Sequence, residues 1–222
     1  MTALLLVLLA LQAPVDEGTL VIREDTVEIA REGFRLTALR TAGGGGNRWT
    51  LASTARYNRT RPVVVLDPIV ELGPDSNPAS LEYNVADPRE PLRILGQLAR
   101  GRFAVRVLGR KTERARELPA PSPAAVLDDS VFALYLPVAW QARARPVAVT
   151  GLFPRAGRRD VLTAQDLGVE PTTLNRDPAS LRHIIVSGGD NRLVHVWLGT
   201  DGRLTKVEIP SRRLVVERAP AS

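Results

Sequence analysis

Short apolar segments that alternate with polar residues, each ending at a turn-forming residue, run through most of this 222-residue chain. In the C-terminal third, four such segments follow one another: 181–186, 193–198, 203–209 and 212–217. Between them stand the stretch 188–191 and Asp201-Gly202, residue types that accept the positive φ angles of tight hairpins. The C-terminal third therefore predicts an antiparallel meander of four strands.

The earlier part of the chain shows the same pattern in segments bounded by Gly, Pro, Asp or Asn: 19–23, 26–30, 33–37, 49–57, 62–66, 81–85 and 103–107. Four glycines at 43–46 predict a flexible hairpin connection, because a glycine run cannot fill a strand. Segment 126–136 has apolar residues at helical spacing before Pro137, so it predicts one short helix, although its second half also suits a strand. We therefore expect a mainly β fold: an antiparallel curved sheet or open β-barrel of successive hairpins, with one short helix near 126–136.

The beginning of the chain carries an unbroken apolar run, Ala3 to Leu11, followed by Gln12, Ala13 and acidic sequence. As a helix this run rises about 13 Å, less than half of a hydrocarbon core of about 30 Å. It predicts a signal peptide at 1–13, which leaves 14–222 as a single antiparallel β domain. An N-terminal core strand or buried helix is the alternative, because no Lys or Arg precedes the run. We expect a bacterial periplasmic or secreted protein with no membrane span in its mature form, and the cleavage position stays undetermined.

Composition narrows the classes of partner. The chain has no Cys, so an exported form must be held together by core burial, and a lipid anchor on Cys is excluded. The net charge is +6, and Lys111 and Lys206 are the only lysines, so the basic charge is nearly all Arg. These arginines are scattered beside Glu or Asp and are not interleaved with aromatic residues. No nucleic-acid partner is therefore expected, whereas attraction to anionic lipid headgroups stays open.

The two histidines, His183 and His195, flank one predicted hairpin. A three-residue loop would place them side by side, where they could share a metal ion, whereas a two-residue loop would place them on opposite faces. No third ligand is evident. The sequence thus predicts two independent histidines, with no metal site and no cofactor.

The Asp128-Asp129-Ser130 triplet sets a hydroxyl beside two carboxylates. It lacks a G-x-S-x-G elbow and a neighbouring His, and helix capping accounts for the same residues. Glu24 and Asp25 fall in a predicted turn and make a weak acid–base pair. No catalytic residue is assigned, which leaves enzymatic activity undecided, with the balance toward none.

Apolar residues cover both faces of several predicted strands, including 63–66, 184–186 and 194–198. Such strands suit a sheet packed on both sides. They also suit a curved sheet whose concave face holds an apolar ligand, with 126–136 lying across it. Five aromatic residues are expected beside such a groove, with plain core positions as the alternative: Trp49, Tyr83, Phe132, Tyr135 and Trp197.

Three segments carry a resemblance: Val27-Glu-Ile-Ala-Arg-Glu-Gly-Phe34, Leu127-Asp-Asp-Ser-Val-Phe-Ala-Leu-Tyr-Leu136 and Val196-Trp-Leu-Gly-Thr-Asp-Gly-Arg-Leu204. Together they resemble a bacterial periplasmic β-rich family of unknown function, and more loosely the lipoprotein-carrier fold, an incomplete β-barrel. The resemblance covers about a third of the chain and does not extend to 58–118. It implies an exported, incomplete barrel with no established catalytic residues.

These observations favour an exported, soluble, non-catalytic binding protein of the bacterial envelope that holds an apolar ligand, a lipid or a lipoprotein on a curved sheet. A hydrolase of envelope polymers and a structural subunit that assembles through exposed strand edges are the alternatives. Lipid or another envelope protein is the expected partner. The sequence does not give the ligand, the oligomeric state or the biological process.

Overall fold

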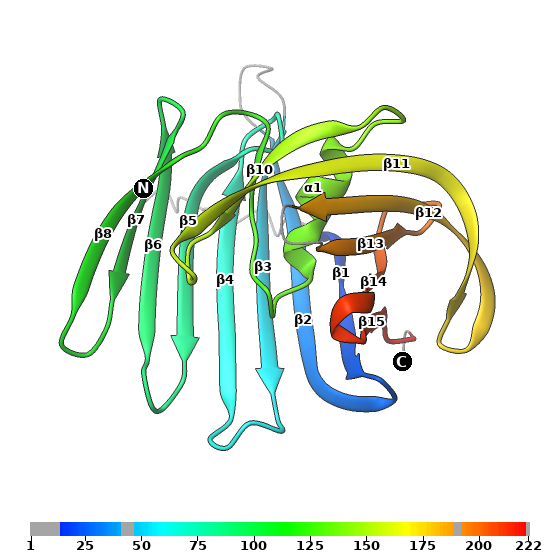
Figure 1. Ribbon diagram of the computed structural model, residues 1–222, viewed down its shortest axis with the longest axis horizontal. Coiled ribbons are helices and arrows are strands. Elements are labelled where there is room, and N and C mark those ends of the chain that lie inside the picture. Colours follow the sequence, from blue (N-terminus) through cyan, green and yellow to red (C-terminus); the bar gives the residue numbers. More distant parts are fainter. Residues whose placement is uncertain (1–13, 41–46, 189–191, 221–222) are drawn as a thin grey trace, which may run out of the picture.

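The structure, a computed structural model, describes residues 14–40, 47–188 and 192–220 (Figure 1). All strands of these residues form one curved sheet of fifteen strands in the order β8-β7-β6-β5-β4-β3-β2-β1-β15-β14-β13-β12-β11-β10-β9. The strands are β1 (Pro14–Glu24), β2 (Val27–Arg40), β3 (Asn47–Tyr57), β4 (Val64–Leu72), β5 (Pro78–Ala86), β6 (Leu92–Ala99), β7 (Arg102–Leu108), β8 (Glu113–Pro119), β9 (Ala124–Val126), β10 (Val147–Phe153), β11 (Arg158–Leu174), β12 (Asp177–Gly188), β13 (Leu193–Leu198), β14 (Leu204–Ile209) and β15 (Leu214–Arg218). The expected mainly β fold, an open and curved antiparallel sheet, is therefore confirmed.

The first and last strands pair in the middle of this sheet, with Leu20 opposite Arg218 and Glu24 opposite Leu214. Strands β1 to β8 form one meander of hairpins, and β10 to β15 form a second. The predicted C-terminal meander of four strands is β12 to β15. The predicted signal segment and the glycine loop at 43–46 lie outside the described residues.

Strand β11 is long enough to bend around the outside of the sheet (Figure 1). The bend coincides with a β-bulge between Asp166 and Gly168, and Gly168 has a φ of +84°, which favours glycine. Beyond the bulge, the β11–β12 hairpin covers part of the convex face. There Lys206 Nζ of β14 donates to the carbonyl oxygen of Thr173 at 2.7 Å.

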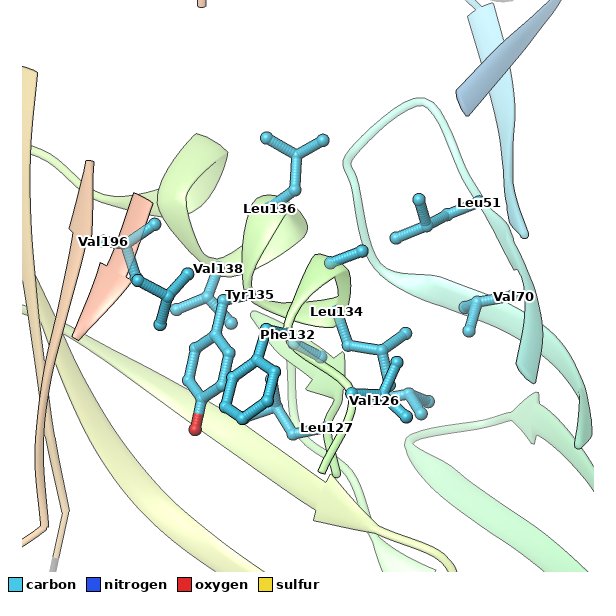
Figure 2. Close-up of a cluster of buried hydrophobic side chains, with 14 of the residues drawn as sticks. Leu51, Val70, Val126, Leu127, Phe132, Leu134, Tyr135, Leu136, Val138 and Val196 are labelled. Atoms are coloured by element: carbon cyan, nitrogen blue, oxygen red, sulfur yellow. The ribbon is translucent and has the colours of Figure 1, made fainter. Parts of the chain in front are cut away.

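Strand β9 is the exception to the antiparallel pattern, because it runs parallel to β10. Parallel neighbours need a long crossover connection, and here residues 127–146 supply it. They contain the 3₁₀ turn η1 (Ala133–Tyr135) and the helix α1 (Leu136–Gln141). We call residues 127–142 the plug, because they fill the concave side of the sheet (Figure 2).

The plug buries most of its apolar side chains against apolar side chains of the sheet. Its side chains with 1% or less of their surface exposed are Leu127, Val131, Phe132, Ala133, Leu134, Tyr135, Leu136, Val138, Ala139 and Ala142. Leu51 of β3, Val70 of β4 and Val196 of β13 belong to the same core (Figure 2). The sheet's concave face is thus occupied largely by its own chain.

The helix lies later than the predicted 126–136, because Ala124–Val126 pair with β10 and Asp128 bridges to Val131. Pro137 does not end the helix but stands in the first turn of α1, where its missing N–H has no intrahelical partner to lose. In the part of the chain that the structure describes, no helix has the length and apolar character needed to cross a bilayer.

Candidate functional site

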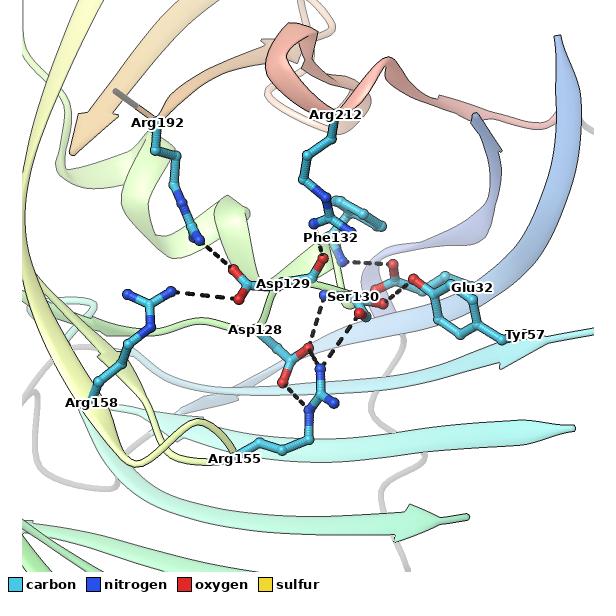
Figure 3. Close-up of polar contacts among 10 residues, drawn as sticks. All are labelled: Glu32, Tyr57, Asp128, Asp129, Ser130, Phe132, Arg155, Arg158, Arg192 and Arg212. Carbon is cyan, nitrogen blue, oxygen red and sulfur yellow. Dashed lines mark hydrogen bonds and ion pairs between the residues drawn. The ribbon is translucent and has the colours of Figure 1, made fainter. Parts of the chain in front are cut away.

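Glu32 of β2 holds the beginning of the plug (Figure 3). Its carboxylate accepts hydrogen bonds from the backbone N–H groups of Phe132 and Ala133, at 2.7 and 2.9 Å, and from Ser53 Oγ at 2.7 Å. The side chain is fully buried, and burial raises its pKa from 4.5 to about 7, although these three hydrogen bonds act in the opposite direction. Glu32 therefore satisfies backbone donors that open the first helical turn.

Asp128 and Ser130 do not cap the helix as the sequence predicted. The residue that precedes η1 is Phe132, whose own side chain makes no capping hydrogen bond. Asp128 instead accepts the backbone N–H of Ser130 at 2.8 Å and forms a bidentate ion pair with Arg155, with both N–O distances 2.7 Å. Because the Asp128 side chain is buried, this pair fixes the plug to the β10–β11 turn.

Asp129 lies among three further arginines at the same end of the sheet (Figure 3). Arg192 Nη2 lies 2.7 Å from its Oδ1, Arg158 Nη2 lies 3.5 Å from its Oδ2, and Arg212 donates to its carbonyl oxygen. The guanidinium groups of Arg158 and Arg192 also stack over the Phe153 ring, at 4.0 and 5.0 Å from its centroid. The plug thus presents its two aspartates to a cluster of arginines.

A cleft opens beside this cluster, where the edge strand β8 approaches the β10–β11 turn. Its volume is about 240 Å³. The residues that line it are Glu90, Leu92, Val105, Val107, Thr112, Arg114, Arg116, Leu118, Pro154, Arg155, Ala156 and Gly157. A second hollow of about 180 Å³, lined in part by Asp128 and Asp129, shares Arg155 and Ala156 with the cleft.

The register of β7 and β8 explains the lining of the cleft. Arg114, Arg116 and Leu118 stand opposite Val107, Val105 and Phe103 respectively. Residues directly opposite each other in an antiparallel pair point to the same face, and Phe103 and Val105 are buried in the core. The β8 edge therefore carries two arginines on the same face of the sheet as an apolar wall.

The electrostatic environment of these two arginines differs from that of arginines on the other face of the same hairpin. Arg102 and Arg106 pair with Glu117 and Glu113 at 2.7 and 2.5 Å. Among the described residues, no carboxylate lies within ion-pair distance of Arg114 or Arg116. Arg116 Nη1 donates to the carbonyl oxygen of Gly157 at 3.1 Å, so it joins β8 to the β10–β11 turn.

The five aromatic residues predicted to lie beside a groove occupy three separate places. Tyr83, Phe132 and Tyr135 are buried in the core with the plug. Trp49 packs on Trp140 of α1, with ring centroids 5.4 Å apart. Trp197 lies on the convex face, stacked on His183 at 3.8 Å. The structure brings three of them together in the interior, and their role in ligand binding stays a prediction.

The sequence feature that could have identified the cleft is in strand β8, ERARELP, where successive residues point to opposite faces of the sheet. Its Arg, Arg and Leu residues share one face, whereas Glu113, Ala115 and Glu117 share the other. Sequence reasoning missed this strand because its first five residues are all exposed.

The prediction of two independent histidines is wrong. The β12–β13 register sets His183 opposite Trp197 and His195 opposite Ile185, so both histidines lie on the convex face as diagonal neighbours. Their rings are in hydrogen-bond contact. Neither expected loop length predicts this register. Across the described ranges, no group of three or more His, Cys, Asp or Glu side chains is arranged to hold a metal ion.

The fold and the cleft define an open, barrel-like β protein whose interior is filled by its own chain. The sequence matches no protein-family model and no curated protein. Among solved structures, it is similar to a β-barrel-like protein of a domain of unknown function, DUF1849, from Brucella abortus. The two are 9% identical, with a TM-score of 0.49, and the match covers 93% of this chain and 96% of the other. The similarity is to a β-rich fold of unknown function and does not extend specifically to the lipoprotein-carrier fold.

Proposed function

We propose that this protein is a non-catalytic binding protein that holds an amphipathic anion, a lipid with one apolar chain and an acidic head, in the cleft at the β8 edge. The observation that carries the proposal is the combination of lining groups. Leu92, Val105 and Val107 offer an apolar wall, and Arg114 and Arg116 stand beside it with no carboxylate partner in the described chain. Apolar linings with a few convergent polar groups are typical of small-molecule sites.

The size of the cleft limits the ligand. At about 240 Å³ it is smaller than the usual range of about 300–1,000 Å³ for sites that enclose a whole small molecule. A segment of one acyl chain would fit into the cleft, with the acidic head group of the lipid outside it at the arginines. A diacyl lipid would have to leave its second chain outside the cleft.

The cleft is better suited to binding than to catalysis. Its described lining contains one carboxylate, Glu90, and one hydroxyl, Thr112, and neither His183 nor His195 belongs to it. A general acid and base need two titratable groups close to one reacting atom. We therefore favour binding over hydrolysis of envelope polymers.

We also propose that the protein works in the bacterial envelope, as a periplasmic or secreted protein. The support is the apolar run Ala3 to Leu11 followed by polar sequence, together with the lack of Cys. Fractionation of cells that express the full chain tests this directly. A processed form in the periplasm or medium is expected, and an unprocessed cytosolic form would overturn it.

Native mass spectrometry of the protein purified from its own envelope, followed by organic extraction, tests the binding proposal first. A co-purifying single-chain lipid would support it. A clean apo mass, with no uptake of added fatty acid, would overturn it.

A series of fatty acids of increasing chain length then tests the cleft itself. Each methylene that enters the cleft contributes about 0.8 kcal/mol, so affinity should rise about fourfold per methylene until the cleft is full. Replacing both Arg114 and Arg116 by Gln should weaken binding at least tenfold. The matched control is Arg106→Gln, on the other face of the same hairpin, which should leave binding unchanged. An equal loss of affinity in the double variant and in the Arg106→Gln control would contradict the assignment of the binding site to this cleft.

A further inference from the structure

We infer that His183 and His195 form a binding site for a divalent transition metal ion on the convex face of the sheet. This site is independent of the cleft, because it lies on β12 and β13 and faces away from the plug. The two residues are the only histidines of the chain, and the chain has no Cys. The fold therefore brings together all of the imidazole ligands that the sequence provides.

The two ring nitrogens face each other. His183 Nε2 lies 2.8 Å from His195 Nδ1, and the ring centroids are 5.1 Å apart. His183 is held on two further sides: its ring stacks on Trp197 with an interplanar angle of 6°, and its Nδ1 lies 2.6 Å from Glu170 Oε2. One imidazole is thus fixed in position by its neighbours before any ion binds.

These contacts determine where the protons lie when both rings are neutral. Glu170 accepts the proton of His183 Nδ1, so His183 Nε2 carries a lone pair. The proton between the rings then belongs to His195 Nδ1, and His195 Nε2 is left with a lone pair.

A metal ion can take the position of the shared proton. Zinc–nitrogen bonds of about 2.0–2.1 Å at tetrahedral angles hold two nitrogens about 3.3 Å apart, so the rings must separate by about 0.5 Å. His195 is only partly buried, so it can make this movement. Its proton moves from Nδ1 to Nε2 through solvent, and no net proton is gained or lost by the pair.

The surroundings match the usual outer contacts of a metal site. A metal-binding His commonly donates its second N–H to a carboxylate, which fixes its tautomer, as Glu170 does for His183. Glu208 of β14 stands directly opposite His195, but its Oε1 pairs with Lys206 Nζ at 2.8 Å. The two imidazoles are therefore the protein ligands of the proposed site, and water completes the coordination.

Metal titration of the full chain without a histidine tag tests the inference. Zn²⁺ should bind with a stoichiometry of one by isothermal titration calorimetry, and Cu²⁺ should quench the fluorescence of Trp197. Replacing His195 by Gln should weaken both at least tenfold. Because His195 is only partly buried and Gln keeps a hydrogen-bonding group beside His183, this variant should stay folded, and its melting temperature checks this.

Two further variants separate a metal site from a hydrogen-bonded pair. Glu170→Gln should weaken Zn²⁺ binding by about 10- to 100-fold, as expected for a residue that positions a ligand. Trp197→Phe should abolish most of the Cu²⁺ quenching while Zn²⁺ still binds. Lack of Zn²⁺ binding into the millimolar range, or the same affinity in His195→Gln as in the wild type, would overturn the inference. Neither result would affect lipid binding in the cleft.

Discussion

The difference in the free energy of unfolding between wild type and the Glu32→Gln variant should depend strongly on pH. Glu32 is fully buried, and its pKa rises from 4.5 to about 7 mainly because burial disfavours the charged form. A carboxyl whose pKa is raised on folding holds its proton more tightly in the folded state. Its stabilising contribution is therefore complete below pH 4.5 and is lost as the pH rises through about 7.

The magnitude follows from the shift. Each pKa unit corresponds to about 1.4 kcal/mol, so the shift in Glu32 amounts to about 3 kcal/mol. Near pH 4.5 the protonated carboxyl group and the Gln amide are similar in shape and both are uncharged. The variant should then be less stable than wild type by about 1 kcal/mol, the value of one hydrogen bond. By pH 8 wild type should have lost about 3 kcal/mol relative to the variant. The order of their stabilities should then reverse.

Urea unfolding of both proteins between pH 4.5 and 8, followed by tryptophan fluorescence, measures this difference. Contributions from other carboxyl groups cancel in the comparison, including those of Asp166 and Glu28, whose pKa values are lowered mainly by Arg182 and Arg31. Glu28→Gln, on the same strand but exposed, is the matched control and should show little pH dependence relative to wild type. A difference for Glu32→Gln that stays constant across this range would refute the reasoning.

Two other substitutions test how the fold is held together. Gly96→Ala should destabilise the protein by about 1–3 kcal/mol, because its Cβ would clash with the ring of Phe103, which packs over Gly96. Gly33→Ala, where no atom lies within 4 Å, is its control in thermal melts, and equal losses would contradict the packing argument. Asp128→Asn should cost about 1.5–3 kcal/mol in urea unfolding, because it removes the buried charged partner of the partly exposed Arg155. Asp201→Asn is the control, because it breaks an exposed ion pair with Arg203, and it should change stability by less than about 0.5 kcal/mol. A similar loss of stability in the two variants would show that the ion pair of Asp128 contributes no more than an exposed one.

The C-terminal meander was predictable because its turn residues and its apolar segments agree. Asp201 and Gly202 mark one turn chemically, and the strands on either side of this turn are short and buried at most positions. Strand β8 was not predictable by the same rule, because both of its faces carry exposed charged residues. Strand β11 was missed because Gly168 and Pro171 interrupt it, and the structure uses this region to bend around the sheet.

The conformation of the plug and the contact between the two histidines could not be predicted from the sequence, because both depend on how distant strands pair. Apart from Asp128, Asp129 and Ser130, segment 126–136 is apolar, and a short apolar run is equally compatible with a buried helix and a buried strand. Its true division, with Ala124–Val126 in β9 and the helix after Phe132, depends on pairing with the distant β10. The contact between His183 and His195 depends on a strand register, and a shift of one residue would place them on opposite faces.

The pairing of β1 with β15 makes this protein a circular permutation of a simple meander. Joining the chain near Pro14 to the chain near Arg218 and opening it between β8 and β9 would make the order of strands in sequence equal to their order in space. In the natural order, the two halves of the sheet can each form from local hairpins, but they meet only when the last strand is present. A chain that lacks its C-terminal strand has no partner for the free edge of β1. The two halves of the sheet are therefore joined by contacts between residues that lie far apart in the sequence, which is the slowest kind of contact to form.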